Sequence, residues 1–308
     1  MKRTILALAV SALLTGTAYA ENIGVSMALF DDNFLTVLRN GMTDYAKTKP
    51  GVNLQVEDAQ NDVGKQLSQI QNFIAQKVDA IIVNPVDTDA TPKMTALATE
   101  AKIPLVFVNR MPSDKTLPAG VSFVGSNEAD SGTLETKEVC KLLGGKGEIV
   151  VMMGELSNQA ARQRTQDVHD VIGKDPCTGI KIIQEQTANW KRTEGADLMT
   201  NWISAGIKPA AVVANNDEMA IGAILALKQA GVGTDKVIVA GVDATQDALA
   251  AMKAGDLKVT VFQNAAGQGS GAVDTALKLV KGEKVEPMVW VPFELVTPDI
   301  ADKYLKKN

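Results

Sequence analysis

The sequence predicts an α/β fold of two doubly wound parallel-sheet lobes. Two observations lead to this prediction. Short apolar runs alternate with segments whose apolar residues recur at helical spacing, and the alternation continues through both halves of the chain. Such runs are typical of strands buried on both faces, which occur in parallel sheets covered by helices on either side.

The first half of the chain contains five apolar runs that we expect to be strands. They are residues 23–28, 52–56, 80–83, 103–108 and 121–124. A helical pattern follows each of the first three runs; after the first, Leu35, Leu38 and Met42 recur at helical spacing. The regular order of strand and helix favours a parallel sheet with right-handed crossovers.

The second half repeats this pattern. Strands are expected at 148–153, 180–184, 211–214, 237–242 and 259–262. The clearest unit is the third, where the polar triplet 215–217 follows the strand and Gly231 ends the helical pattern. No Gly/Ser-rich or Pro-rich linker separates the halves, so we expect several short crossings between the lobes rather than one tether.

Composition narrows the class of protein. The chain of 308 residues is long enough for two domains and carries a formal net charge of -5, without a basic footprint for nucleic acid. One histidine and two cysteines leave too few ligands for a zinc site, so we expect neither a metal nor a cofactor.

Residues 1–20 have the pattern of a secretory signal peptide. Lys2 and Arg3 precede an apolar core at 5–14, and Ala18-Tyr19-Ala20 forms a cleavage site. We expect cleavage after Ala20 and export to the periplasm. An uncleaved membrane anchor is the alternative, but it needs a longer apolar span.

Export would affect the oxidation state of the two cysteines. In an oxidising compartment Cys140 and Cys177 are a candidate disulfide, and two buried free thiols are the alternative.

Polar and aromatic residues follow the predicted strands of both halves. In open α/β sheets, ligands bind outside the carboxyl ends of the strands, so these residues are candidate ligand contacts. Amides, carboxylates and arginines suit vicinal hydroxyls, and aromatic rings cover the C–H face of a sugar. The candidates are Asp32, Phe34, Asn84, Asn109, Arg110, Ser126, Arg162, Trp190, Asn216, Asp243 and Gln263.

Each candidate also has a structural alternative. Asn84 precedes a proline and suits a turn, Arg162 has Asp167 nearby as an ion-pair partner, Trp190 suits a core, and Asp243 suits a helix cap. Asn216 and Asp217 could both cap the following helix; we expect Asn216 to contact ligand and Asp217 to cap the helix or steady the loop.

Several of these segments carry a family resemblance. The chain resembles the periplasmic sugar-binding proteins of bacterial ABC importers, specifically the ribose-binding branch, over essentially all of its length after the signal peptide. The matching segments are 58–62 (DAQND), 82–87 (IVNPVD), 108–110 (VNR), 160–162 (AAR), 215–220 (NNDEMA), 241–245 (GVDAT) and 281–285 (KGEKV). The resemblance implies that Phe34 and Trp190 stack on a sugar ring. It assigns ligand hydroxyls to Arg110, Arg162, Asn216, Asp243 and Gln263.

Two positions depart from the ribose-binding pattern. Asp32 stands where that branch has an asparagine, and Asn109 where it has an aspartate before the arginine. Exchanging a carboxylate for an amide changes which hydroxyls can be satisfied. With the large face of Trp190, this favours a hexose or a cyclitol such as inositol over ribose.

The resemblance also implies the domain boundaries. The N-terminal lobe would hold 21–125 and 264–287, the C-terminal lobe 126–263 and 288–308, and a three-stranded hinge would join them. Ligand would close the lobes, and the closed monomer would deliver it to a membrane permease of an ABC importer or present it to a chemoreceptor.

Two other classes of protein compete with this reading. A sugar-processing enzyme could use Asp32 and Asp243 as paired carboxylates, but no Ser/His/Asp set is present. A repressor would need a helix-turn-helix where the signal peptide stands.

Overall fold

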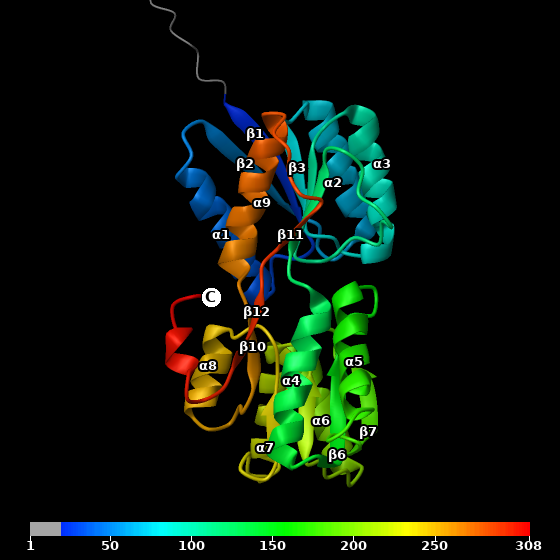
Figure 1. Cartoon of the computed structure of the whole chain (residues 1–308), viewed down its shortest axis with the longest axis vertical. Coiled ribbons are helices and arrows are strands. Elements are labelled where there is room, and N and C mark those ends of the chain that lie inside the picture. Colours follow the sequence, from blue (N-terminus) through cyan, green and yellow to red (C-terminus); the bar gives the residue numbers. More distant parts are fainter. Residues whose placement is uncertain (1–19) are drawn as a thin grey trace, which may run out of the picture.

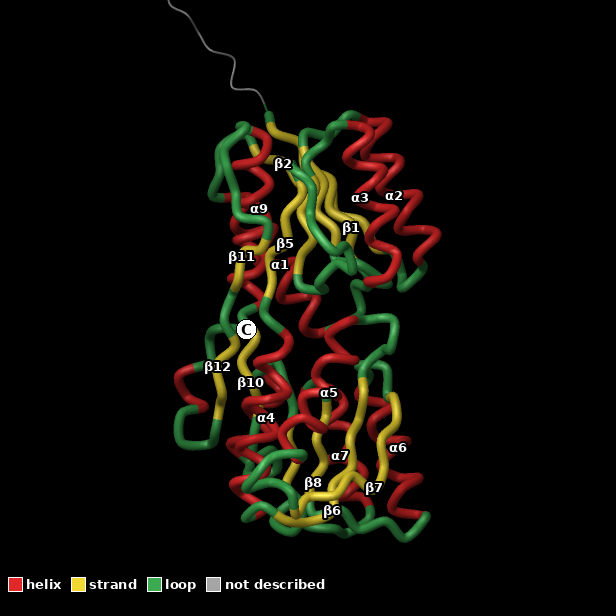
Figure 2. The backbone as a smooth tube through the Cα atoms, turned by 45° about the vertical axis from the view of Figure 1, so that its right-hand side comes forward, coloured by secondary structure: helices red, strands yellow, loops and turns green. Residues whose placement is uncertain are grey.

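A computed structural model of the protein describes residues 20–308. The predicted signal peptide lies outside the described residues, apart from Ala20. The described chain forms two lobes stacked along the long axis of the molecule, as Figures 1 and 2 show. Both contain parallel sheets covered by helices, so the predicted fold class is confirmed.

The N-terminal lobe is built on one six-stranded parallel sheet. Its strands are β1 (Glu21–Met27), β2 (Val52–Asp58), β3 (Ala80–Val83), β4 (Leu105–Val108), β5 (Val121–Gly125) and β11 (Met288–Trp290). They lie in the order β11-β5-β4-β3-β1-β2. The helices are α1 (Asn33–Lys47), α2 (Val63–Gln76), η1 (Thr88–Ala90), α3 (Thr91–Ala101) and α9 (Ala265–Val280).

Alternate residues of these strands enter two different cores. On β3, Ile82 packs with residues of α1 and α9, whereas Ile81 packs with residues of α2 and α3. This period of two is what a strand buried on both faces requires. On one face α1 and α9 approach closely: a Cβ at Gly269 would lie 2.5 Å from the carbonyl oxygen of Leu38.

The C-terminal lobe has a four-stranded parallel sheet and an antiparallel pair. The sheet holds β6 (Lys146–Met153), β7 (Gly179–Thr187), β8 (Ala211–Ala214) and β9 (Ile238–Ala240), in the order β7-β6-β8-β9. The pair is β10 (Thr260–Gln263) with β12 (Phe293–Val296). Two parallel bridges join this pair to the four-stranded sheet: Ala240, the last residue of β9, pairs with Val259, and Asp243 pairs with Phe262 of β10.

Helices cover both faces of the second sheet as well. They are α4 (Glu128–Leu143), α5 (Gln159–Ile172), α6 (Arg192–Ser204), α7 (Asp217–Gln229), α8 (Gln246–Lys253) and η2 (Ala301–Lys303). The core on the face of α4 and α5 includes Cys140 and Cys177, which the structure joins in a disulfide. The helices α6, α7 and α8 pack on the other face.

The chain crosses between the lobes three times. The crossings follow β5, β10 and β11. The sequence placed the last boundary at residue 288, but Met288–Trp290 pairs with β5 and Val291 donates to the Gly125 carbonyl at 2.8 Å. The third crossing therefore comes after Val291, because these residues add an edge strand to the first sheet.

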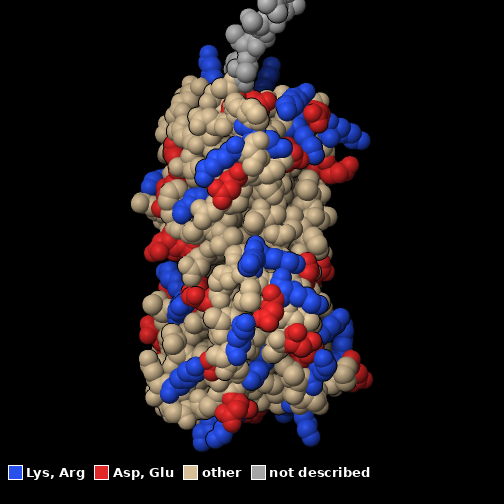
Figure 3. Space-filling view, turned by 90° about the vertical axis from the view of Figure 1, so that its left-hand side faces the viewer, with Lys and Arg blue, Asp and Glu red and all other residues tan. Residues whose placement is uncertain are grey.

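The surface carries no block of one charge on the face seen in Figure 3, where Lys and Arg alternate with Asp and Glu over both lobes. Among the described residues, no helix has the length and apolar composition that crossing a membrane requires.

Candidate ligand-binding cleft

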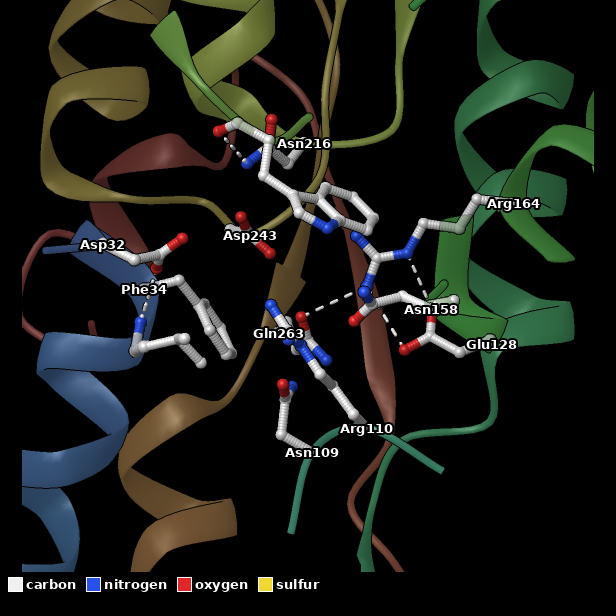
Figure 4. A pocket seen from close by; sticks show the side chains of 13 residues that line it. Asp32, Phe34, Asn109, Arg110, Glu128, Asn158, Arg164, Asn216, Asp243 and Gln263 are labelled. Atoms are coloured by element: carbon white, nitrogen blue, oxygen red, sulfur yellow. Dashed lines mark hydrogen bonds and ion pairs between the residues drawn. The ribbon is translucent and has the colours of Figure 1, made fainter. Parts of the chain in front are cut away.

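A small cavity lies between the two lobes, at the carboxyl ends of strands from both sheets. Its volume is about 50 Å³, against roughly 10–15 Å³ needed for one water, so it suits a small molecule. The residues around it are Asp32, Phe34, Leu35, Asn109, Arg110, Glu128, Asn158, Ala160, Arg164, Trp190, Asn216, Asp243 and Gln263. Figure 4 shows these side chains converging from opposite sides.

The N-terminal lobe contributes an acid and an arginine. The Oδ1 atom of Asp32 accepts from the Leu35 amide at 2.7 Å and so caps α1. Burial raises the pKa of Asp32, although this hydrogen bond opposes the rise. Arg110 follows β4, and its Nη1 donates to the Pro85 carbonyl at 2.9 Å, which leaves the rest of the guanidinium available to the cavity.

In the C-terminal lobe, an ion pair forms one wall. Nε of Arg164 lies 2.7 Å from Oε2 of Glu128, and both side chains are buried. The same guanidinium donates to the Asn215 carbonyl at 2.6 Å and to Oε1 of Gln263 at 3.3 Å. The amide nitrogen of Gln263 thus stays free, because its oxygen faces Arg164.

An aromatic ring lines the cavity from each lobe. Phe34 comes from the first turn of α1, and Trp190 from the loop after β7. The indole packs against bare backbone at Gly154, where a Cβ would lie 2.2 Å from the ring. Trp190 has φ 67°, a left-handed conformation that bulky residues rarely adopt. Strain of this kind is characteristic of binding sites.

Several polar groups of the cavity have no hydrogen-bond partner among residues 20–308. They are Nε1 of Trp190, Oδ1 of Asn158 and Nε2 of Gln263. No described residue hydrogen-bonds the carboxylate of Asp243 either, and burial raises its pKa well above the usual range despite the nearby Arg164. Buried polar groups are normally paired, so these donors and acceptors are available to a ligand.

Asn216 has two roles. Its Oδ1 accepts from the Met219 amide at 3.0 Å and caps α7, while Nδ2 donates to the Trp190 carbonyl at 3.1 Å. Asp217 does not cap the helix: it accepts from the Thr245 amide at 2.9 Å and steadies the loop after β9. Burial raises the pKa of Asp217 to about 7. Thr245 caps α8, so the alternative of a capping role for Asp243 is wrong.

The structure places eight of the predicted contacts on the cavity and three outside it. Those on the cavity are Asp32, Phe34, Asn109, Arg110, Trp190, Asn216, Asp243 and Gln263. Asn84 and Ser126 lie behind the wall instead. Asn84 donates to Oδ1 of Asn109 at 3.3 Å, Asn109 donates to Gln268 at 3.2 Å, and Gln268 donates to Ser126 at 2.9 Å. This chain of amides fixes which way the Asn109 amide faces.

Arg162 is the third predicted residue outside the cavity. Its side chain is 41% exposed and pairs with Asp89 of the other lobe at 3.2 Å, not with Asp167. The arginine on the cavity is Arg164, two residues later, because positions two apart on a helix point in nearly opposite directions. Ala160 also lines the cavity, and Arg164 follows it by four residues, which puts both on the same face of the helix. This spacing is the sequence signal that could have identified Arg164 as the cavity arginine.

Glu128 and Asn158 were also missed by the sequence analysis. Each stands at the beginning of a helix, at the first residue of α4 and at the N-cap of α5. In the sequence they look like ordinary helix-start residues.

Hydrogen bonds join the lobes at the rim of the cavity. Thr88 donates its amide to the Ser157 carbonyl at 3.1 Å and its hydroxyl accepts from the Gln159 amide at 3.1 Å. Asn61 donates to Glu155 across the same opening at 2.7 Å. The two lobes are therefore in direct contact at this rim.

The site holds no arrangement suited to a metal: among the described residues, no group of three or more His, Cys, Asp or Glu side chains could hold one. The cavity can therefore form hydrogen bonds to a ligand and can contact the ligand with two aromatic rings.

Comparison with known proteins decides the family. The profile of the periplasmic binding protein domain matches residues 23–284. The chain belongs to the periplasmic binding protein family. The structure of this periplasmic binding protein agrees with the family. It superposes with a TM-score of 0.89 on a solute-binding protein of an ABC transporter from Bacillus halodurans, which was solved with bound myo-inositol. That protein is 43% identical, with 96% of this chain and 100% of the other covered.

Curated relatives of this periplasmic binding protein are also binding proteins, so it is not an enzyme. It is 64% identical, over the full length of both chains, to a Rhizobium meliloti protein that is proposed, by its name, to bind rhizopine. It is 31% identical to the ribose import binding protein of Salmonella typhimurium, with 94% of this chain and 95% of the relative covered. The family resemblance read from the sequence is confirmed.

Proposed function

We propose that the protein binds a cyclic polyol by closing its two lobes around the ring. The proposed ligand is a hexose or an inositol-like cyclitol rather than ribose. The observation that carries the proposal is a cavity between the lobes, lined by two aromatic side chains and by polar groups that have no partner among the described residues. The rings of Phe34 and Trp190 would pack on the ligand ring. The ligand hydroxyls would form hydrogen bonds with Trp190 Nε1, Asn158 Oδ1 and Gln263 Nε2.

The ring class follows from the polar groups at the N-terminal wall. Asp32 can only accept hydrogen bonds when ionised, and Arg110 of the same lobe can only donate them. Asn109 is committed through its oxygen to Asn84 and through its nitrogen to Gln268, an arrangement that an aspartate could not make. The relative with bound myo-inositol supports a cyclitol of this size.

Closure follows from the placement of these groups on both lobes. Arg110 and Asp32 belong to one lobe, Asp243 and Gln263 to the other. A ligand that satisfies both sets stabilises the closed state more than the open state. The hydrogen bonds at the rim are few and partly exposed, and they add little alone.

We further propose the route of the ligand. The protein is exported with its signal peptide removed after Ala20, acts in the periplasm as a monomer, and delivers the ligand to the membrane permease of an ABC importer. Family membership supports the location and the importer. A chemoreceptor as a second partner stays a prediction.

A ligand screen tests the proposal. Thermal unfolding is measured with pentoses, hexoses, amino sugars, pentitols and cyclitols, since a ligand that binds only the folded state raises the melting temperature. We expect the largest shift with a hexose or cyclitol, followed by micromolar or tighter binding in calorimetry. The variant R110A is the control and should show no shift. A larger shift with ribose would refute the ring class, and no shift with any compound would refute polyol binding.

The export proposal has a separate test. Protein isolated from the periplasmic fraction should have a mass that begins at Glu21. A product that keeps residues 1–20, or one found only in the cytoplasm, would contradict it.

A further inference from the structure

The tail after η2 ends beside the hinge. Ala301 and Tyr304 are buried in the core of the C-terminal lobe, and Tyr304 lies against Phe262 of β10 with ring centroids 5.1 Å apart. The tyrosine hydroxyl also donates to Glu294 at 2.7 Å. These contacts bring Asn308 to the crossing between β10 and α9, where Figure 1 marks the end of the chain.

Every polar atom of the Asn308 side chain is used there. Its Nδ2 donates to the Asp243 carbonyl at 2.7 Å and to the Gln263 carbonyl at 2.7 Å. Its Oδ1 accepts from the Ala265 amide at 3.1 Å. Asp243 and Gln263 line the cavity, as Figure 4 shows, and Ala265 is the first residue of α9 in the other lobe. One amide therefore connects two cavity residues with the hinge.

The cavity residues need such support. Asp243 has φ 125° and the next residue, Ala244, has φ 51°, conformations that residues other than glycine seldom adopt. The backbone bond from the Gln263 amide to the Asp243 carbonyl is long, at 3.3 Å. Because no described residue hydrogen-bonds the Asp243 carboxylate, its direction depends on the backbone that carries it.

The crossing itself is short. Gln263 ends β10 and Ala265 begins α9, so Asn308 contacts the chain on both sides of the single residue between them. A rotation of the lobes about this crossing changes the distance from Asn308 to Ala265, while its distances to Asp243 and Gln263 of its own lobe stay fixed.

We propose that Asn308 is a positioning residue of the binding site, which fixes the backbones of Asp243 and Gln263 and couples them to the angle of the hinge. This inference depends on the proposed function, because it takes Asp243 and Gln263 to be ligand contacts. Asn308 itself does not line the cavity.

Two variants separate the two halves of the amide, and a third is the control. N308A removes all three hydrogen bonds. N308D keeps an acceptor for the Ala265 amide and loses the donor to both carbonyls. K307A is the control, since Lys307 lies on the same tail but faces Phe262 and Tyr304 through cation–π contacts.

Two measurements are made on each purified variant. Calorimetry and stopped-flow kinetics with myo-inositol give the affinity and the release rate, and hydrogen exchange without ligand follows the Ala265 amide. We expect N308A to bind about tenfold more weakly, through faster release, and to exchange the Ala265 amide at least about tenfold faster. N308D should show the weaker binding with wild-type exchange at Ala265, and K307A should match the wild type in both.

The outcomes distinguish this proposal from the proposed function. If the wild type does not bind myo-inositol or any other polyol, the proposed function fails, and exchange at Ala265 still decides whether Asn308 holds the hinge. Wild-type exchange at Ala265 in N308A overturns the positioning role. So does wild-type affinity in both variants, even if their melting temperatures fall.

Discussion

Arg164 and Glu128 form an ion pair in the wall of the cavity, with 2.7 Å between Nε and Oε2 and side chains only 4% and 2% exposed. The pair comes from the helices α5 and α4, whose contact fixes it in place. Glu128 thereby orients the guanidinium, which in turn donates to the oxygen of Gln263.

Breaking this pair from one side should be costly. R164A leaves the Glu128 carboxylate buried without its cation, so we expect a loss of about 3–5 kcal/mol in the free energy of unfolding, measured with urea. The double variant R164M/E128Q should recover most of that stability and still fail to bind ligand. A single variant as stable as the wild type would contradict this assignment.

Arg162 should behave differently. R162A removes an ion pair between half-exposed side chains at the rim, and such pairs contribute about 0.2–1 kcal/mol. We expect ligand release about two- to fivefold faster in stopped-flow kinetics, with the fold intact. D89A should reproduce the effect, and the double variant should add nothing to it. A loss of binding of about a hundredfold in R162A alone would instead favour direct ligand contact, as the sequence suggested.

Arg110 and Asp243 are expected to carry much of the affinity. R110A and D243A should each weaken binding about a hundredfold in calorimetry, because each removes charge-assisted hydrogen bonds of about 1.5–3 kcal/mol. Their circular dichroism should match that of the wild type. D44A, at an exposed carboxylate far along α1, is the control and should bind normally. Unchanged affinity in both cavity variants would refute the assignment.

Asp167 should give the protein a pH-dependent stability. Burial raises the pKa of Asp167 to about 6, against about 3.9 in an unfolded chain. Between these values the native state keeps the proton that the unfolded state has lost, so the free energy of unfolding falls as pH rises from 4 to 6. With partial solvent screening we expect a fall of about 1–2 kcal/mol.

The variant D167N isolates this contribution. The free energy of unfolding is measured with urea at pH 4, 5, 6 and 7 for both proteins. The value for the wild type minus the value for D167N should decrease up to pH 6 and then level off. A difference that is constant over this range would show that the carboxyl titrates normally in the native state.

The disulfide should stabilise the protein without affecting the cavity. Cys140 and Cys177 close a loop with a sequence separation of 37, and C140A/C177A should lose about 3–4 kcal/mol in urea unfolding. Cys140 lies twelve residues along α4 from Glu128, about 18 Å, so ligand affinity should not change. A large loss of affinity together with full stability would contradict both expectations.

The sequence by itself determined the order of the first ten strands, up to β10, and the edge of each sheet at which the cavity lies. Apolar runs and helical spacing are local signals, and the carboxyl ends of parallel strands meet at one edge by geometry. That is why residues such as Asp32, Arg110, Asn216 and Asp243 could be named as neighbours although they are far apart in the chain.

Only the tertiary structure decided which side chains face the cavity. The choice between Arg162 and Arg164 depends on the rotation of α5 against the sheet, and Glu128 becomes part of the wall because α4 packs on α5. Asn84 and Ser126 have the right chemistry but lie behind Asn109, which Asn84 contacts directly and Ser126 only through Gln268. The roles of β11 and Asn308 depend on contacts across more than forty residues, and no local pattern encodes the direction in which a side chain meets such a partner.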